Sequence, residues 1–147
     1  MDSHKIVRYH GGMEKIILLH QKLNQLYQLA KNLHWFSRTY AHHLLLDRVA
    51  DGLLEDDDAL VELFLMDEDF VSLPVPAAQI TESDGKTYTY EPQTKEPELV
   101  TIFMKTLDEA IKLCDEAKSE KNYGAASSAL DGIQEHLIVK KNLVWSS

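Results

Sequence analysis

One face of a single helical segment carries most of the side chains that could bind a metal ion. If the chain from His43 onward is an α-helix, each residue turns by about 100°. With His43 at zero, the acidic positions lie between about 40° and 120°, on one third of the circumference. These positions, which we name the acidic stripe, are Asp47, Asp51, Glu55, Asp58 and Glu62. Apolar residues such as Leu46 and Leu53 centre near about 270°, on the opposite side.

Two interpretations of the acidic stripe are open. Charged runs usually face water, and a solvated face needs no metal. However, like charges four residues apart destabilise a helix, and Arg48 is the only basic residue between His43 and Glu62. A bound cation would relieve that repulsion. Carboxylates with imidazole and no thiolate suit hard or borderline ions such as iron or manganese.

This face of the helix carries two pairs of potential ligands. His43 and Asp47 are four residues apart, so their side chains project side by side and could clamp one ion. Asp58 and Glu62 repeat that spacing. Asp58 follows Asp47 by 11 residues, which is roughly 16 Å along a helix. Two pairs so far apart cannot bind one ion within a straight helix, and antiparallel pairing of two copies would bring them together. We therefore expect a homo-oligomer.

A His-Trp pair, His34 and Trp35, closes the preceding amphipathic segment. A tight connection at residues 37–39, with Ser or Thr as the helix cap, would reverse the chain and return His34 towards His43. His34 could then be a metal ligand or a half-buried capping histidine, and both remain open. Trp35 and Tyr40 could donate electrons to a reactive intermediate, but core packing is the interpretation that we prefer for both.

Four other residues of chemical interest receive simpler interpretations. His42 lies about 100° from His43 on a helix, so we expect it at the surface. His20 and His136 are single histidines on helical segments, and we assign them no role. Cys114, the one cysteine, cannot form an intrachain disulfide, and we interpret it as a buried structural thiol.

The candidate ligands together resemble the ferroxidase motif of the Dps mini-ferritins. The residues that carry the resemblance are His34-Trp35, His43-x-x-x-Asp47 and Asp58-x-x-x-Glu62. In that family, too, Asp-x-x-x-Glu begins 11 residues after the preceding Asp. Residues 65–76 and Trp145 are also similar to the family's layout. The interval of 9 residues from His34 to His43 is shorter than in typical Dps proteins and is similar to a divergent, short-turn branch. A lysine-rich tail is missing.

The resemblance implies an activity and a way of building the site. It implies that ferrous iron is bound, oxidised by peroxide or oxygen, and stored inside an oligomeric cage. One subunit would supply His34, His43 and Asp47, and its neighbour across a twofold interface would supply Asp58 and Glu62. Trp35 would be the catalytic electron donor. The shortened interval would shift His34 relative to the other ligands, so His34 is the proposed ligand that it affects most.

Four amphipathic segments must position these residues. Apolar side chains recur every three or four residues in stretches that begin near Met13, Leu46, Leu99 and Ala126. Between residues 66 and 97 the pattern stops, and prolines mark a long connection. Residues 86–90 alternate like a short strand with no obvious partner. This order predicts an all-α, ferritin-like four-helix bundle of one domain, residues 1–147, with a long crossover between the second and third helices.

Charge and hydropathy limit the possible partners. The 147 residues include 24 acidic and 15 basic side chains, for a net charge of −9. Because an acidic surface repels phosphate backbones, we expect no strong binding to nucleic acid. No apolar run suits a membrane span and no export signal is evident, so we expect a cytoplasmic protein. The alternative function is a non-enzymatic helical oligomer or interaction protein without a working metal site.

Overall fold

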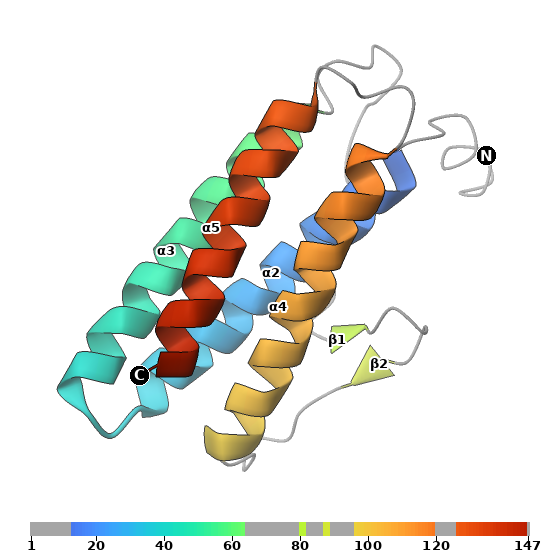
Figure 1. Ribbon diagram of the computed structural model, residues 1–147. Helices are drawn as coiled ribbons and strands as arrows, with labels where there is room; N and C mark the ends of the chain where they lie inside the picture. Colours follow the sequence, from blue (N-terminus) through green and yellow to red (C-terminus); the bar gives the residue numbers. More distant parts are fainter. Residues whose placement is uncertain (1–12, 64–79, 82–86, 89–95, 120–125, 147) are drawn as a thin grey trace.

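The computed structural model describes residues 13–63, 80–81, 87–88, 96–119 and 126–146. These ranges contain four long helices (Figure 1): α2 (Met13–Phe36), α3 (Tyr40–Glu62), α4 (Glu96–Lys118) and α5 (Ser127–Ser146). Two short strands, β1 (Ile80–Thr81) and β2 (Thr87–Tyr88), complete the described elements. The predicted all-α four-helix bundle is confirmed for this part of the chain. Within it, no helix is apolar enough over a sufficient length to cross a membrane.

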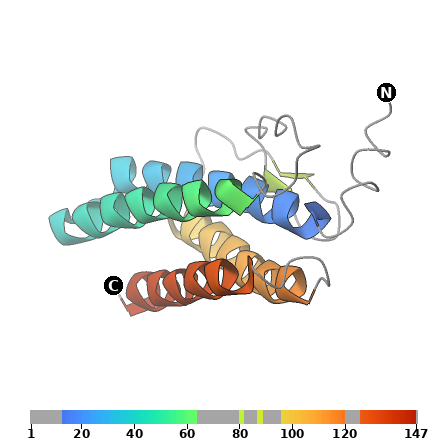
Figure 2. The same ribbon diagram turned by 90° about the horizontal axis from the view of Figure 1, so that it is seen from above.

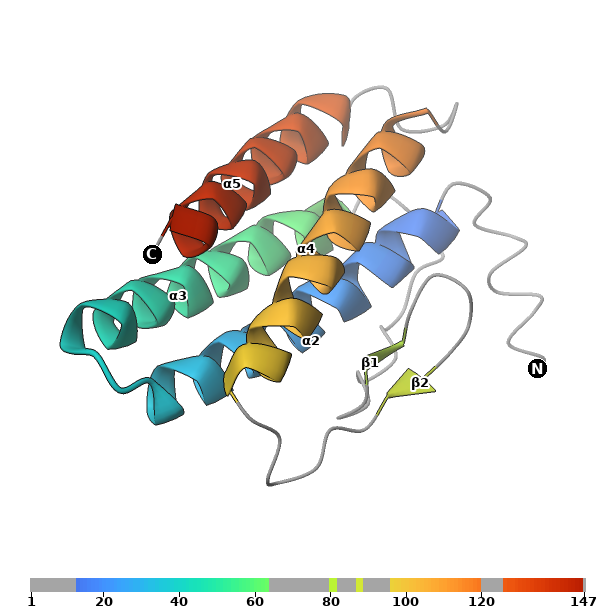
Figure 3. The same cartoon turned by 60° about the horizontal axis from the view of Figure 1, so that its bottom comes forward.

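The four helices form two packed layers. Seen from above, α2 lies beside α3 in one layer and α4 beside α5 in the other (Figure 2). Between the layers, α2 packs on α4 and α3 packs on α5. The first two helices are antiparallel, whereas α3 and α4 point in the same direction along the bundle (Figure 1). The α2–α3 turn and the C-terminal end of α5 lie at the same end of the molecule (Figure 3).

Apolar side chains at helical spacing form the core. The apolar positions of α2 that follow the spacing of three and four residues are all buried: Ile16, Leu19, Leu23, Leu26, Ala30 and Leu33. From α3 the core receives Leu46, Leu53 and Leu60, on the side opposite the acidic stripe. Truncation of a buried leucine typically costs about 2–5 kcal/mol, so this core sets the rotation of each helix and thereby the direction of the stripe.

The turn between α2 and α3 ends at Thr39, whose backbone is extended (φ −107°, ψ 140°). Its Oγ1 accepts a hydrogen bond from the backbone N–H of His42 at 3.3 Å. Its carbonyl accepts from the N–H of His43 at 2.9 Å, which starts the helical ladder. Capping by Ser or Thr in this turn is confirmed for Thr39, and it satisfies one of the amides that the first helical turn leaves unpaired.

Within the strand-like alternation over residues 86–90, the described residues 87–88 have a partner that the sequence pattern did not reveal. β2 pairs antiparallel with β1, with Ile80 opposite Tyr88 and Thr81 opposite Thr87. β1 also packs beside α2. α4 begins at Glu96, so Pro97 lies in its first turn, where the missing N–H costs no helical hydrogen bond. The rest of the expected connection, residues 66–79, 82–86 and 89–95, is outside the described residues.

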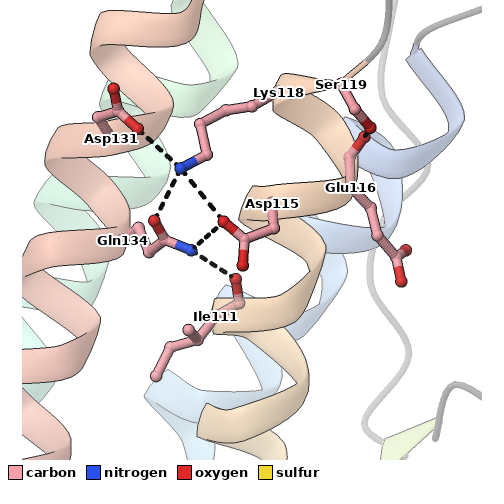
Figure 4. A network of polar contacts seen from close by, with 7 residues as sticks. All are labelled: Ile111, Asp115, Glu116, Lys118, Ser119, Asp131 and Gln134. Atoms are coloured by element: carbon pink, nitrogen blue, oxygen red, sulfur yellow. Dashed lines mark hydrogen bonds and ion pairs between the residues drawn. The ribbon is translucent and has the colours of Figure 1, made fainter.

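A closed polar network joins α4 to α5 (Figure 4). The Lys118 ammonium donates to Asp131 at 2.7 Å and to the Gln134 carbonyl at 2.8 Å. The Gln134 amide donates to the Ile111 backbone carbonyl at 3.0 Å and to Asp115 at 2.8 Å. The hydrogen bonds from Gln134 and Lys118 lower the pKa of Asp115, and the bond to Asp131 raises the pKa of Lys118. We name these contacts the α4–α5 network.

Candidate functional site

The acidic stripe lies on the outward side of α3. Asp51, Glu55, Asp58 and Glu62 are exposed, and the Asp47 side chain is 43% exposed. The helical angles derived from the sequence therefore give the correct side of the helix. Among the described residues, the four exposed carboxylates have no hydrogen-bond or ion-pair partner. Their charges face solvent in a single copy of the chain.

His34 and His43 meet where α2 turns into α3. Their rings stack with centroids 3.8 Å apart and planes 25° from parallel. Each ring Nδ1 lies 2.6 Å from the backbone carbonyl oxygen of the other histidine. The expectation that the turn returns His34 to His43 is confirmed. The capping-histidine interpretation of His34 also predicts a half-buried ring bonded to the backbone, so its ligand role stays a prediction.

These contacts determine which ring nitrogen is available in each histidine. A carbonyl oxygen can only accept a hydrogen bond, so both Nδ1 atoms must carry the proton. In a neutral ring the lone pair then lies on Nε2, the atom that would bind a metal. The His34 side chain is 12% exposed, and its Nε2 is 3.7 Å from Asp47 Oδ1. One imidazole nitrogen and one carboxylate oxygen therefore face each other at the end of the bundle.

Lys31 already forms an ion pair with the Asp47 carboxylate. Its ammonium is 3.2 Å from Asp47 Oδ1 and 5.8 Å from the centre of the Trp35 ring. A lysine in this position offsets one negative charge of the acidic stripe without a metal. An incoming cation would compete with Lys31 for Asp47.

The structure does not bring the two halves of the motif together within one chain. Asp58 and Glu62 lie further along α3, roughly 16 Å and 22 Å from Asp47 at 1.5 Å per residue. Over residues 13–63, 96–119 and 126–146, no three His, Cys, Asp or Glu side chains gather closely enough to hold a metal ion. A complete five-ligand site would therefore need a second copy.

The prediction that Trp35 and Tyr40 pack in the core is wrong. Trp35 is 57% exposed and Tyr40 is 76% exposed. Trp35 lies about 150° from the centre of the α2 core, and Tyr40 falls at about 60° on the α3 wheel, inside the stripe. Tyr40 also stacks at 6.5 Å on His43. His42, expected at the surface, is half-buried and hydrogen-bonded to Ser37 Oγ at 3.2 Å.

Sequence reasoning missed two polar groups built on Asp56 and Asp57. The Asp56 side chain is 4% exposed, and its oxygens lie 2.7 Å from His136 Nδ1 and 3.3 Å from Lys140 Nζ. Both partners are on α5. The residue falls at about 220° on the α3 wheel, only about 50° from the apolar centre, and this position was a signal of burial.

Asp57 forms the second of these groups on the opposite flank of α3, facing α2. Its side chain is 14% exposed and its Oδ1 is 2.6 Å from His20 Nδ1. Asn24 donates to Asp57 Oδ2 at 3.1 Å. His20 and His136 therefore both have partners, although the sequence pattern assigned neither a role. Two consecutive aspartates thus join α3 to two different neighbours.

Cys114 is buried, as expected for a structural thiol. Burial raises the pKa of Cys114 to about 12. The thiolate is the nucleophilic and metal-binding form. Cys114 therefore stays protonated at neutral pH and contributes no ligand to the candidate site.

Comparisons of the chain with protein-family models, curated proteins and solved structures found no match. The resemblance to the Dps mini-ferritins therefore stays a prediction from the motif residues on α2 and α3 and their spacing. The function of the site has to follow from its geometry and its chemistry.

Proposed function

We propose that this chain is the subunit of a Dps-like ferroxidase, which binds ferrous iron at a site shared between two copies and oxidises it. Electrons from iron reduce peroxide or oxygen, and an oligomeric cage retains the ferric product. Iron is the substrate of this reaction. The observation that carries the proposal is the His34–His43 pair beside Asp47.

The pair has the chemistry that a metal site needs. Hydrogen bonds from Nδ1 at 2.6 Å fix the orientation of both rings and leave both Nε2 lone pairs for an ion. Asp47 supplies a partly exposed oxygen 3.7 Å from His34 Nε2. Imidazole with carboxylate suits ferrous iron, because this donor set is neither purely hard nor soft.

The remaining ligands would come from a second copy. Asp58 and Glu62 are exposed and have no partner among the described residues, so they are free to approach another chain. Trp35 and Phe36, which are 57% and 66% exposed, lie next to His34 in the sequence. Exposed aromatic side chains beside an incomplete site are what an interface between subunits would cover. Trp35 would then lie close enough to the iron to donate an electron.

The direction of the helices supports the ferritin-like part of the proposal. α3 and α4 point the same way (Figure 1), as a long crossover between the second and third helices would require. A single long crossover between the second and third helices is the ferritin-like topology. A hollow assembly of such bundles would provide the cage.

Lys31 favours the alternative function, a helical oligomer or interaction protein without a working metal site. Its ion pair with Asp47, at 3.2 Å, balances the carboxylate without iron. The Lys31→Met substitution separates the two functions. If iron binds, removal of the competing ammonium should increase the iron retained by purified protein. An unchanged metal content would favour the alternative.

The main test is the rate of ferrous oxidation. Protein is loaded anaerobically with ferrous iron, peroxide is added, and the growth of ferric absorbance is followed. Asp47→Ala and Glu62→Ala should each slow oxidation, by roughly 10- to 100-fold if ligand loss resembles the loss of supporting contacts at metal sites. His34→Ala should have a milder effect.

Asp51→Ala is the matched control for this assay. It removes a carboxylate from the same stripe of α3 but lies outside the proposed ligand set, so it should oxidise iron at the parent rate. If Asp47→Ala and Glu62→Ala also keep the parent rate, the stripe is only a solvated face and the proposal fails.

A further inference from the structure

The Asp56–His136 pair between α3 and α5 has an unusual distribution of exposure. The Asp56 side chain is 4% exposed, whereas the His136 side chain is 63% exposed. Burial of a carboxylate is costly unless it is paired, and His136 Nδ1 at 2.7 Å provides one partner. The rest of the imidazole extends into solvent. A buried anion therefore anchors an accessible ring.

The contact determines the state of the ring. A carboxylate only accepts hydrogen bonds, so Nδ1 of His136 carries the proton. In the neutral ring the lone pair is then on Nε2, which has no partner among the described residues. Nε2 is therefore the ring nitrogen that can act as a nucleophile.

Lys140 supplies a cation one helical turn further along α5. Its ammonium is 3.3 Å from Asp56 Oδ2, and its side chain is 12% exposed. The side chain passes over Gly52 of α3, where an added Cβ would lie 2.8 Å from Lys140 Cε. The contact between α3 and α5 therefore fixes the position of the Lys140 side chain.

The Asp57–His20 pair provides an internal comparison. It has the same short contact, 2.6 Å from Asp57 Oδ1 to His20 Nδ1, but the His20 side chain is only 10% exposed. Asn24 lies 3.4 Å from the same His20 nitrogen. His20 is thus largely enclosed between α2 and α3. Exposure, rather than the Asp–His contact, distinguishes His136.

We propose that His136 is a phosphoryl-acceptor residue that takes its phosphoryl group from a phosphoramidate donor. The Nε2 lone pair attacks phosphorus and forms an N–P bond, while the P–N bond of the donor breaks. The donor nitrogen, already protonated, leaves as a neutral amine with the electron pair. The His136 ring keeps its Nδ1 proton and becomes positively charged. Asp56 opposes that charge, and Lys140, paired with the other Asp56 oxygen, keeps the carboxylate in place.

The test uses the folded full chain with phosphoramidate as the probe. Phosphohistidine is located by peptide mass spectrometry at alkaline pH, and the rate is compared with that of N-acetylhistidine. We expect His136 to react roughly tenfold faster than N-acetylhistidine, because a hydrogen-bond partner that orients a histidine ring and fixes its tautomer has an effect of that order at metal sites. We expect no labelling of His20. If His136 is unlabelled, or reacts no faster than N-acetylhistidine, the proposal is wrong.

Asp56 acts through His136 as a positioning residue, so its test includes the tautomer of the ring. In the unmutated protein, ¹⁵N NMR should show the proton of His136 on Nδ1, and this measurement does not depend on any variant folding. Asp56→Asn should shift that proton towards Nε2 and reduce the labelling rate to that of N-acetylhistidine. Asp57→Asn, the matched control at the next residue, should change neither reading of His136. A rate that is the same with and without the Asp56 carboxylate would overturn its role.

Discussion

Acidic side chains on the two faces of α3 have opposite environments. Asp58 and Glu62 on the outward face are exposed and have no partners among the described residues. Asp56 and Asp57 on the flanks of the core each have a histidine and a second polar side chain as partners. The partnered carboxylates hold helices together, whereas the unpartnered ones repel each other in the isolated chain. Carboxylates that would gain stability from an added cation or partner are the better candidates for binding an ion or a second copy.

Removal of Asp56 should give the largest change in stability. Asp56→Ala would leave the 12%-exposed Lys140 side chain without its carboxylate, and breaking a buried pair in this way costs about 3–5 kcal/mol. His136 can be rehydrated, so we expect a loss near the lower end of that range. Chemical unfolding of the variant and the parent at neutral pH measures it. A loss no larger than that of an ordinary surface substitution would mean that Asp56 stabilises the protein no more than an outward-facing carboxylate does.

Two glycine substitutions sharpen the comparison on the α5 side. Alanine is favoured over glycine inside a helix by about 1 kcal/mol. Gly132→Ala should show most of that gain, because nothing lies within 4 Å of the added Cβ. Gly52→Ala should show less, since its Cβ would lie 2.8 Å from Lys140 Cε and 3.0 Å from Nζ. Equal gains in the two melting temperatures would show that Lys140 does not lie over Gly52.

The α4–α5 network tests whether partners, rather than burial, make a carboxylate stabilising. Asp115 is exposed, with 66% of its side chain accessible, yet hydrogen bonds from Gln134 and Lys118 lower its pKa. A carboxylate with a lowered pKa adds stability above its unfolded pKa and loses it as the pH falls through the folded value. The parent should therefore lose more stability than Asp115→Asn below about pH 4. Parallel thermal melts at neutral and acidic pH decide this, and identical losses would contradict it.

The smallest expected effect is on the outward face itself. Asp58→Ala should raise the stability of the metal-free protein by a few tenths of a kcal/mol, because it removes like-charge repulsion along the helix. The gain should shrink in high salt, which screens exposed charges. Thermal melts at low and high salt measure both. A clear destabilisation would mean that Asp58 has a stabilising contact in the isolated chain.

The sequence alone determined the local features of this protein. Apolar spacing identified the four helices and the outward direction of the acidic stripe, because helical periodicity depends only on neighbouring residues. The short turn through Thr39 also predicted that His34 would return to His43. Even the exposure of Trp35 and Tyr40 was present in their helical angles, although core packing was the preferred interpretation.

Only the tertiary structure decided which side chains meet across helices. The partners of Asp56 are 80 residues away at His136 and 84 residues away at Lys140, and no local pattern encodes such a distance. The pairing of β1 with β2 was hidden for the same reason, since a two-residue strand carries too little periodicity to identify its partner. Contacts of this kind depend on how each helix rotates and approaches its neighbours, and the packing of the whole core sets both.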